Sequence, residues 1–275
     1  MIPIRKSRSV EERFLRYGIK SLSPTSLNLW ISEPARWVLQ YIYKIKESGP
    51  AMWRGRAVEA GLITAISYRE SSLEDCLRGA LSVFDSSKDE EFEKISPEDC
   101  EKIADERNTV EDQIKTVIDE FREKIPQSPI AIQRKVDLDI GIEVPLSGRL
   151  DVEFENFFDD IKSTNSMPSS YETVKVSMRR QISFYSAGTG KPGRLVFVSK
   201  RPNTNSHSGL KIFEIPEDES KELMSQYVNA ARAIRRVLMN TETPEEIAEM
   251  LIPNYDSYFW SERTKTEAKK IWTAA

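Results

Sequence analysis

Hydrophobic residues recur at helical spacing through the first half of the chain. After Ser23, a residue type that caps helix starts, the pattern predicts a helix that is interrupted at Pro34, because proline breaks the helical hydrogen-bond ladder. Three further helices are predicted over residues 52–66, 73–84 and 97–125. Residues 20–126 are therefore expected to form a helical N-terminal annex with long polar faces.

Near residue 130 the hydrophobic period changes from helical spacing to strand-like runs of β-branched and aromatic residues. Five strands are predicted, over residues 130–140, 144–155, 157–164, 194–199 and 210–215. Helices are predicted over residues 169–186, 217–239, 243–251 and 261–272. This order indicates an α/β (α+β) fold, with a central mixed β-sheet flanked by helices. We expect one domain over residues 1–275, with the helical part at 20–126, the sheet and its helix at 127–216, and C-terminal helices at 217–275.

The second and third predicted strands carry the most informative polar residues. The residues between them, Glu155 and Asn156, suit a two-residue turn. With that turn, Asp151 lies directly opposite Asp160, and Lys162 lies two residues further along the same face. Opposed carboxylates repel each other, and a divalent cation between them would remove this cost. The pattern favours a metal site, while an exposed hairpin face with a surface Asp–Lys pair is the alternative.

Two predicted helices also place polar residues on apolar faces. Glu59 lies within an apolar stripe, where an unpaired carboxylate is costly. Metal coordination would satisfy it. The alternative is a carboxylate that extends to solvent or pairs with Arg56 or another basic residue. On the helix after the hairpin, Gln181 and Tyr185 lie one turn apart on an otherwise apolar face. They would either orient the lysine, a water or a phosphate, or serve as structural hydrogen-bonding groups.

In chain order these features are the motifs Gly55-x-x-x-Glu59, Gly148-x-x-Asp151, Asp160-x-Lys162 and Gln181-x-x-x-Tyr185. This order resembles the PD-(D/E)xK nuclease superfamily, particularly its RecB-like and bacteriophage lambda exonuclease-like members, over residues 20–200. The resemblance implies a restriction-endonuclease-like core. It implies that Mg²⁺ or Mn²⁺ is held by Glu59, Asp151, Asp160 and the backbone carbonyl of Ile161. The implied catalytic residues are Lys162, Asp160, Asp151, Glu59, Gln181 and Tyr185.

The chain departs from this resemblance in ways that change the expected cofactors. RecB-like members often have histidine where this chain has Glu59. Iron–sulfur relatives carry a cysteine before the proline of the opening helix, where this chain has Glu33. We therefore expect no iron–sulfur cluster. The chain also has no glycine-rich Lys-Ser/Thr loop, so we expect no use of ATP.

Charge distribution adds a candidate DNA surface. The net charge is −4, yet residues 162–213 hold many lysines and arginines and a single acid, Glu172. Such a basic segment in an acidic protein indicates a local polyanion-binding surface, and a solvated basic face is the alternative. The candidate DNA-binding residues are Arg54, Arg56, Arg149, Ser163, Lys175, Arg179 and Arg180.

Other sequence features exclude several classes of protein. No apolar run reaches the roughly 18 to 20 residues that a membrane span needs, and no signal-peptide pattern opens the chain. A cytoplasmic location is expected by default, in the host cytoplasm if the protein is phage-encoded. Cys76 and Cys100 are too few for a disulfide framework or a four-thiolate metal site. His207 lies in a polar turn, which disfavours a histidine-centred catalytic triad.

The sequence therefore predicts a metal-dependent deoxyribonuclease, most simply an exonuclease that acts on DNA ends in recombination, repair or replication. A catalytically inactive nucleic-acid-binding module and a structure-specific endonuclease are the alternatives. DNA is the expected partner, with a single-strand annealing or binding protein and a second copy of the chain as further candidates.

Overall fold

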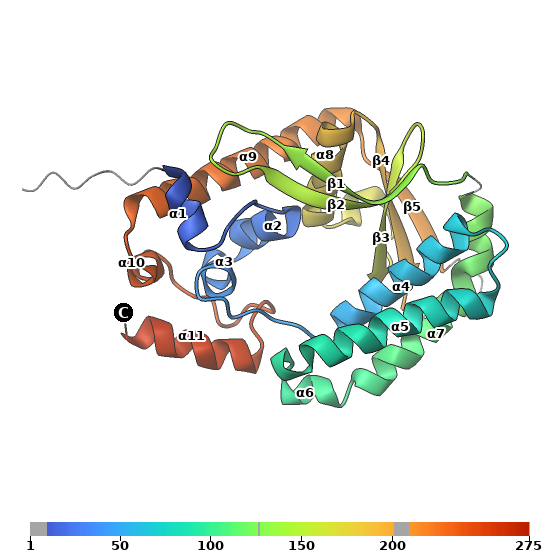
Figure 1. The fold of residues 1–275 in the computed structure, drawn as a ribbon, viewed down its shortest axis with the longest axis horizontal. Helices are drawn as coiled ribbons and strands as arrows, with labels where there is room; N and C mark the ends of the chain where they lie inside the picture. Colours follow the sequence, from blue (N-terminus) through green and yellow to red (C-terminus); the bar gives the residue numbers. More distant parts are fainter. Residues whose placement is uncertain (1–9, 126, 201–208, 275) are drawn as a thin grey trace, which may run out of the picture. The chain divides into compact units, whose positions relative to one another are not determined.

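The computed structural model describes residues 10–125, 127–200 and 209–274, and its strands form one five-stranded sheet in the order β1-β2-β3-β4-β5 (Figure 1). The strands are β1 Ala131–Leu138, β2 Leu146–Glu153, β3 Phe158–Thr164, β4 Gly193–Ser199 and β5 Leu210–Glu214. β3 and β4 run parallel, whereas the β2–β3 and β4–β5 pairs are antiparallel. The predicted mixed sheet is thus confirmed. The turn with His207 lies outside the described residues.

The helices fall near the predicted ranges, and they too are shown in Figure 1. They are α1 Val10–Arg16, α2 Pro24–Ser32, α3 Pro34–Tyr41, α4 Pro50–Ser67, α5 Leu73–Glu91, α6 Pro97–Cys100, α7 Ile103–Lys124, α8 Val176–Thr189, α9 Glu217–Asn240, α10 Pro244–Glu249 and α11 Glu262–Ala274, with 3₁₀ turns at Phe92–Lys94 and Tyr171–Thr173. α5 extends beyond its predicted end because its last residues are polar and give no apolar period. The helix predicted over residues 97–125 is divided into α6 and α7.

The chain divides into two compact units, each assembled from separate stretches of sequence. The first unit comprises residues 1–46, 137–148 and 223–275. The second unit comprises residues 47–136 and 149–222. The second unit contains most of the sheet and all the residues predicted to be catalytic. The single domain predicted over the whole chain stays a prediction.

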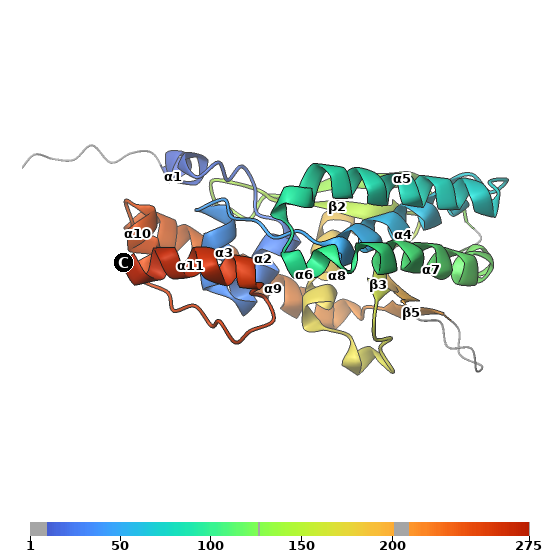
Figure 2. The ribbon, with the colours of Figure 1, turned by 90° about the horizontal axis from the view of Figure 1, so that it is seen from below.

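In the second unit, α4, α5 and α7 form a helical layer whose members run side by side (Figure 2). Apolar side chains of this layer, such as Trp53 and Phe121, share one buried cluster with Val152 and Ile161 of the sheet. Each fully buried large side chain contributes roughly 1.5 to 3 kcal/mol to stability. A Cβ at Gly61 would lie 2.5 Å from Ile114 Cδ1, so the glycine permits the close packing of α4 and α7.

α8 packs on the sheet face that carries Phe158. The Tyr185 ring of α8 meets the Phe158 ring edge to face, with centroids 6.0 Å apart. A Cβ at Gly193 would lie 2.2 Å from Phe158 and 2.5 Å from Ile182, so this glycine allows helix and sheet to approach. Side chains alternate along a strand, so Asp160 and Lys162 of β3 lie on the same face as Phe158. α8 is thereby held close to these two residues.

The first unit is built around buried tryptophans. Ser23 caps α2 by accepting the Ser26 N–H at 3.1 Å, and the Trp37 indole donates to Ser26 Oγ at 3.0 Å. Trp260 is buried and packs with Leu39 in a second apolar cluster, so it acts there as a packing aromatic.

Among the described residues, no helix has the length and apolar character that crossing a membrane requires.

Candidate active site

β2 and β3 form the hairpin that the sequence predicts. Their Cα register pairs Val152 with Asp159, and the next pair along this register is Asp151 and Asp160. The predicted hairpin register is therefore confirmed at Val152–Asp159 and Glu153–Phe158, and the opposition of the two aspartates follows by extending it one residue. At this point the N–H of Ile161 donates to Asp151 Oδ2 at 2.8 Å. The aspartate side chain thus takes the place of a backbone acceptor, which fixes its orientation.

Asp160 is fully buried, and its carboxylate contacts one ammonium group and one amide group. The Lys162 ammonium lies 2.6 Å from Asp160 Oδ2. Gln181 of α8 donates from Nε2 to Asp160 Oδ1 at 3.0 Å. Beyond the lysine ion pair, Asp160 Oδ2 has no hydrogen-bond partner among the described residues. One buried carboxylate oxygen therefore retains acceptor capacity.

Glu59 reaches the same cluster from α4 through a residue of β1, Gln133. The Gln133 amide donates to Glu59 Oε1 and, at 3.4 Å, to Asp151 Oδ1. Arg56 is not the partner of Glu59, because its guanidinium lies 3.0 Å from Glu91. The amide therefore links two carboxylates that carry the same charge.

Gln133 adopts an uncommon backbone conformation. Its φ of 49° lies in the left-handed region, which residues other than glycine rarely occupy. Such a conformation costs on the order of 1 to 3 kcal/mol and persists only where the surroundings impose it. The contacts of its amide with Glu59 and Asp151 are part of those surroundings. The strained backbone of Gln133 and the hydrogen bonds of its side chain to the two carboxylates thus occur at the same residue.

The electrostatics of the cluster follow from burial and like charge. Burial and the nearby charge of Asp160 raise the pKa of Glu59 to about 7. Burial and the charges of Asp160 and Glu59 raise the pKa of Asp151 well above its usual value. Burial would lower the pKa of Lys162, but the charges of Asp160 and Asp151 outweigh it and raise that pKa. The lysine is therefore a cation at neutral pH.

The donor set fits a hard divalent cation in chemistry. Three carboxylates repel one another, and Asp160 Oδ2 lacks a hydrogen bond. Mg²⁺ and Mn²⁺ prefer such oxygen donors. In the arrangement that the structure describes, however, no three Asp, Glu, His or Cys side chains are grouped closely enough to hold a metal. The amide of Gln133 and the ammonium of Lys162 lie among the carboxylates, so binding a cation would require these groups to adjust.

Tyr185 is linked to the backbone of β2. Its buried hydroxyl donates to the carbonyl oxygen of Arg149. Burial and the charge of Asp160 raise the pKa of this hydroxyl, so it remains protonated. Tyr185 therefore holds α8 against the strand that carries Asp151. The side chain of Arg149 itself is exposed.

Two residues predicted to contact DNA are instead joined in a buried polar network. The Arg54 guanidinium pairs with Glu106, and its Nε donates to Ser163 Oγ at 3.1 Å. Ser163 Oγ donates in turn to Gln113 at 3.1 Å. The donors of Arg54 and Ser163 that these contacts use point into the protein. In the structure these two side chains are therefore occupied by contacts within the protein.

The other predicted DNA contacts differ in their surroundings. Arg56 is half-exposed and pairs with Glu91. Arg179 pairs with Glu219, and its guanidinium lies 5.2 Å from the centre of the Tyr171 ring. The charge of Arg179 is therefore largely compensated within the protein. Arg180 is half-buried on α8, next in sequence to Arg179.

Lys175 is exposed and lines a cavity of about 290 Å³ next to the cluster. The β3–β4 register pairs Phe197, another lining residue, with Lys162. Met178, also in the lining, precedes Gln181 by one turn of α8. The cavity therefore adjoins the sheet face that carries the lysine. Its full lining is Thr164, Ser166, Met167, Pro168, Ser169, Thr173, Lys175, Met178 and Phe197.

Sequence reasoning missed Gln133 as a member of the cluster. A glutamine within a predicted strand carries no motif, and its left-handed backbone has no glycine or asparagine to signal it. Asp159 neighbours Asp160 on β3, and because side chains alternate along a strand it lies on the opposite face of the sheet, where it is buried. The structure explains it through Arg194, whose Nε and second nitrogen lie 2.7 and 2.8 Å from the two carboxylate oxygens. Only the parallel β3–β4 pairing brings these residues together.

A solved structure shares this fold. The structure is similar to a crystal structure described as a putative exonuclease from Eubacterium rectale, with a TM-score of 0.56 and 12% identity over 97% of this chain and 93% of that one. A crystal structure named SSO0001 shows 11% identity over 89% of this chain and 93% of that one, at a TM-score of 0.39. No curated protein matches the sequence. The model of the PD-(D/E)XK nuclease superfamily matches residues 21–256, and the chain therefore belongs to this superfamily.

Proposed function

We propose that this protein is a divalent-metal-dependent DNA nuclease that hydrolyses phosphodiester bonds and works from DNA ends. The observation that carries the proposal is the gathering of Glu59, Asp151 and Asp160 beside Lys162. Burial raises the pKa of all three acids, and the charge of Asp160 raises those of Glu59 and Asp151 further. Such a cluster is unfavourable unless a cation joins it. Clusters of this kind are typical of functional sites.

In this proposal Glu59, Asp151, Asp160 and the carbonyl of Ile161 hold Mg²⁺ or Mn²⁺. Such a cation, when bound, polarises a phosphate oxygen and lowers the pKa of a coordinated water. Lys162 stays protonated, because the carboxylates raise its pKa. It therefore acts on the developing negative charge of the phosphoryl group as a fixed cation and hydrogen-bond donor, rather than as a proton acceptor.

Further residues act on the cluster by holding it in position. Gln181 donates to Asp160 and leaves the other oxygen of that carboxylate, which lies beside Lys162, for a cation. Gln133 donates to Glu59 and Asp151 and keeps their oxygens directed toward one another. Tyr185 holds α8 against β2 through the Arg149 carbonyl. We propose these three as positioning residues.

The proposed substrate path follows exposed and half-buried basic residues near the cluster. Lys175, Arg180 and Arg149 remain the candidates for phosphate contacts after the burial of Arg54 is taken into account. The cavity lined by Lys175 adjoins the face that carries Lys162. The part of the proposal that concerns DNA ends rests on the resemblance of the motif order to lambda exonuclease-like members. The similar structure described as a putative exonuclease is consistent with it.

One assay tests both the nuclease and the preference for ends. End-labelled linear DNA and closed circular DNA of the same sequence are incubated with the protein in Mg²⁺ or in EDTA. We expect degradation of the linear form alone, only with Mg²⁺, and its loss in Asp160→Asn. Glu172→Gln, which removes an exposed carboxylate outside the cluster, should cleave normally. Cleavage of the circle would favour an endonuclease, and no cleavage of any DNA would favour a binding module.

A further inference from the structure

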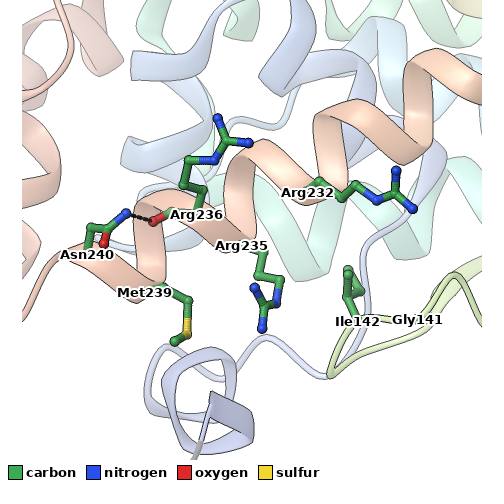
Figure 3. Close-up of a pocket in the computed structure, with 7 residues that line it drawn as sticks. All are labelled: Gly141, Ile142, Arg232, Arg235, Arg236, Met239 and Asn240. Carbon is green, nitrogen blue, oxygen red and sulfur yellow. Dashed lines mark hydrogen bonds between the residues drawn. The ribbon is translucent and has the colours of Figure 1, made fainter. Parts of the chain in front are cut away.

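The first unit contains a basic pocket that is separate from the carboxylate cluster. It has a volume of about 460 Å³ and lies between α9 and the segment that joins β1 to β2 (Figure 3). The residues that line it are Gly141, Ile142, Arg232, Arg235, Arg236, Met239 and Asn240. The lining contains three arginines and no carboxylate. In a chain of net charge −4, such a concentration of positive charge needs an explanation.

Arg235 is held by an acid just outside the lining. Its Nε lies 2.8 and 2.9 Å from the two carboxylate oxygens of Glu143, and a second guanidinium nitrogen lies 2.6 Å from one of them. This contact ties the arginine to the residue that follows Ile142 in the chain. In Figure 3 the Arg235 side chain leaves α9 on the lower side, where Gly141 and Ile142 also lie. The ion pair also compensates the charge of Arg235. The positive charge available to a ligand therefore comes from the other two arginines.

Arg232 and Arg236 are exposed, and neither is paired with a carboxylate among the residues that the structure describes. They are four residues apart on α9, so they are neighbours on the helix surface, about 6 Å apart along its axis. In Figure 3 the Arg232 side chain extends along the helix and away from Arg236, whose side chain rises from the upper edge of the helix. The two guanidiniums thus offer donors at two separate points.

We infer that this pocket binds phosphate groups of a nucleic-acid backbone. Arginine is the residue best suited to phosphate, because its planar guanidinium donates paired hydrogen bonds and stays charged at every physiological pH. Two separated and uncompensated arginines suit successive phosphates of a polymer better than one small anion. Met239 and Ile142 give the pocket apolar sides without adding negative charge. The choice of DNA as the polymer rests on the proposed function, whereas the pocket itself does not.

The test compares the salt dependence of DNA affinity between variants. Fluorescence anisotropy of labelled duplex DNA is measured at several salt concentrations in EDTA, with Asp160→Asn in every protein so that no cleavage occurs. Arg232→Ala/Arg236→Ala should bind more weakly and flatten the log–log slope by about 1.8, since each phosphate contact contributes about 0.9. Arg78→Ala/Lys221→Ala is the matched control, because it removes two exposed basic residues outside the pocket. Its slope should stay close to that of the parent protein.

Each other outcome has a definite meaning. An unchanged slope in the pocket variant, or an equal change in both variants, would overturn the inference. So would a parent protein that binds no DNA. Equilibrium dialysis with ADP tests whether the pocket binds a free nucleotide instead. That is the result if the pocket variant loses ADP binding while the salt dependence of its DNA affinity stays unchanged. Failure of the proposed nuclease would show in the Mg²⁺ assay and would leave this metal-free comparison intact.

Discussion

Gln181 of α8 donates a hydrogen bond of 3.0 Å to Asp160 of β3. The contact ties α8 to the carboxylate whose other oxygen lies 2.6 Å from Lys162. Asp160 is therefore oriented from two sides, by an amide and by an ammonium.

Adjacent aspartates should respond in opposite ways to the same substitution. Asp160→Asn removes one of three repelling carboxylates, and Asp151 and Glu59 still compensate the charge of Lys162. Thermal stability in EDTA should therefore stay level or rise, while Mg²⁺-dependent cleavage is lost. Asp159→Asn leaves Arg194 without its partner in a buried ion pair and should cost roughly 3 kcal/mol of stability. Thermal unfolding in EDTA and a cleavage assay measure both effects. A loss of stability in Asp160→Asn as large as in Asp159→Asn would argue for a purely structural pair.

Lys162→Ala should lower turnover strongly and leave DNA binding in place. One contact made in the transition state is typically worth roughly 2.7 to 4 kcal/mol, which corresponds to about 100- to 1000-fold in rate. Single-turnover cleavage with saturating protein measures the chemical step, and anisotropy measures binding. The control is Lys221→Ala, an exposed lysine outside the cluster. A decrease of less than about tenfold would contradict a catalytic role for Lys162.

The metal-free protein should lose stability as the pH rises. Glu59 has a pKa of about 7 in the folded protein and about 4.5 when unfolded, so folding favours its protonated form. This favourable contribution is complete below pH 4.5 and is lost as the pH passes through about 7. Melting temperatures in EDTA between pH 4.5 and 8 measure the loss. Glu59→Gln should reduce it, and Mg²⁺ should offset it at the upper end of the range. An unaltered pH profile in Glu59→Gln would contradict the assignment.

Gln133 should show separate backbone and side-chain effects. Gln133→Ala and Gln133→Gly both remove the amide that joins Glu59 to Asp151, so both should impair cleavage. Glycine accepts the φ of 49° without strain, so it should be more stable than the alanine variant by about 1 kcal/mol. Chemical denaturation of the two variants in EDTA gives the difference. Equal stability would show that the left-handed backbone is not strained.

The sequence predicted the hairpin well because the information is local. The turn, the register and the pairing of Asp151 with Asp160 follow from strand periodicity over a short stretch. Glu59 and Gln181 were also placed on inward faces by helical spacing, which depends only on nearby residues. Their contact partners were harder to infer. Arg56 was a candidate for Glu59, yet it pairs with Glu91 at the end of α5.

The features that escaped prediction depend on contacts between distant segments. The residues next to Arg54 in sequence predict an exposed cation. In the structure Arg54 is buried and forms an ion pair with Glu106 of α7. Gln133 joins the cluster only because β1 and α4 come close together. The hydrophobic pattern of one segment does not indicate which other segment it will pack against. The charge of a segment likewise does not show which of its cations are already paired, as Arg179 with Glu219 illustrates.

The entry of Glu59 from α4 has a consequence for the order of folding. The hairpin with Asp151 and Asp160 needs only a short loop to form, whereas Glu59 is separated from it along the chain by α5 and α7. Closing that longer loop carries the greater entropic cost, so helix α4 is expected to dock after the hairpin has formed. During refolding, the full carboxylate cluster would therefore be completed late. Recovery of cation affinity would report the assembly of the helical layer on the sheet, and a folding intermediate would be held back from cutting DNA.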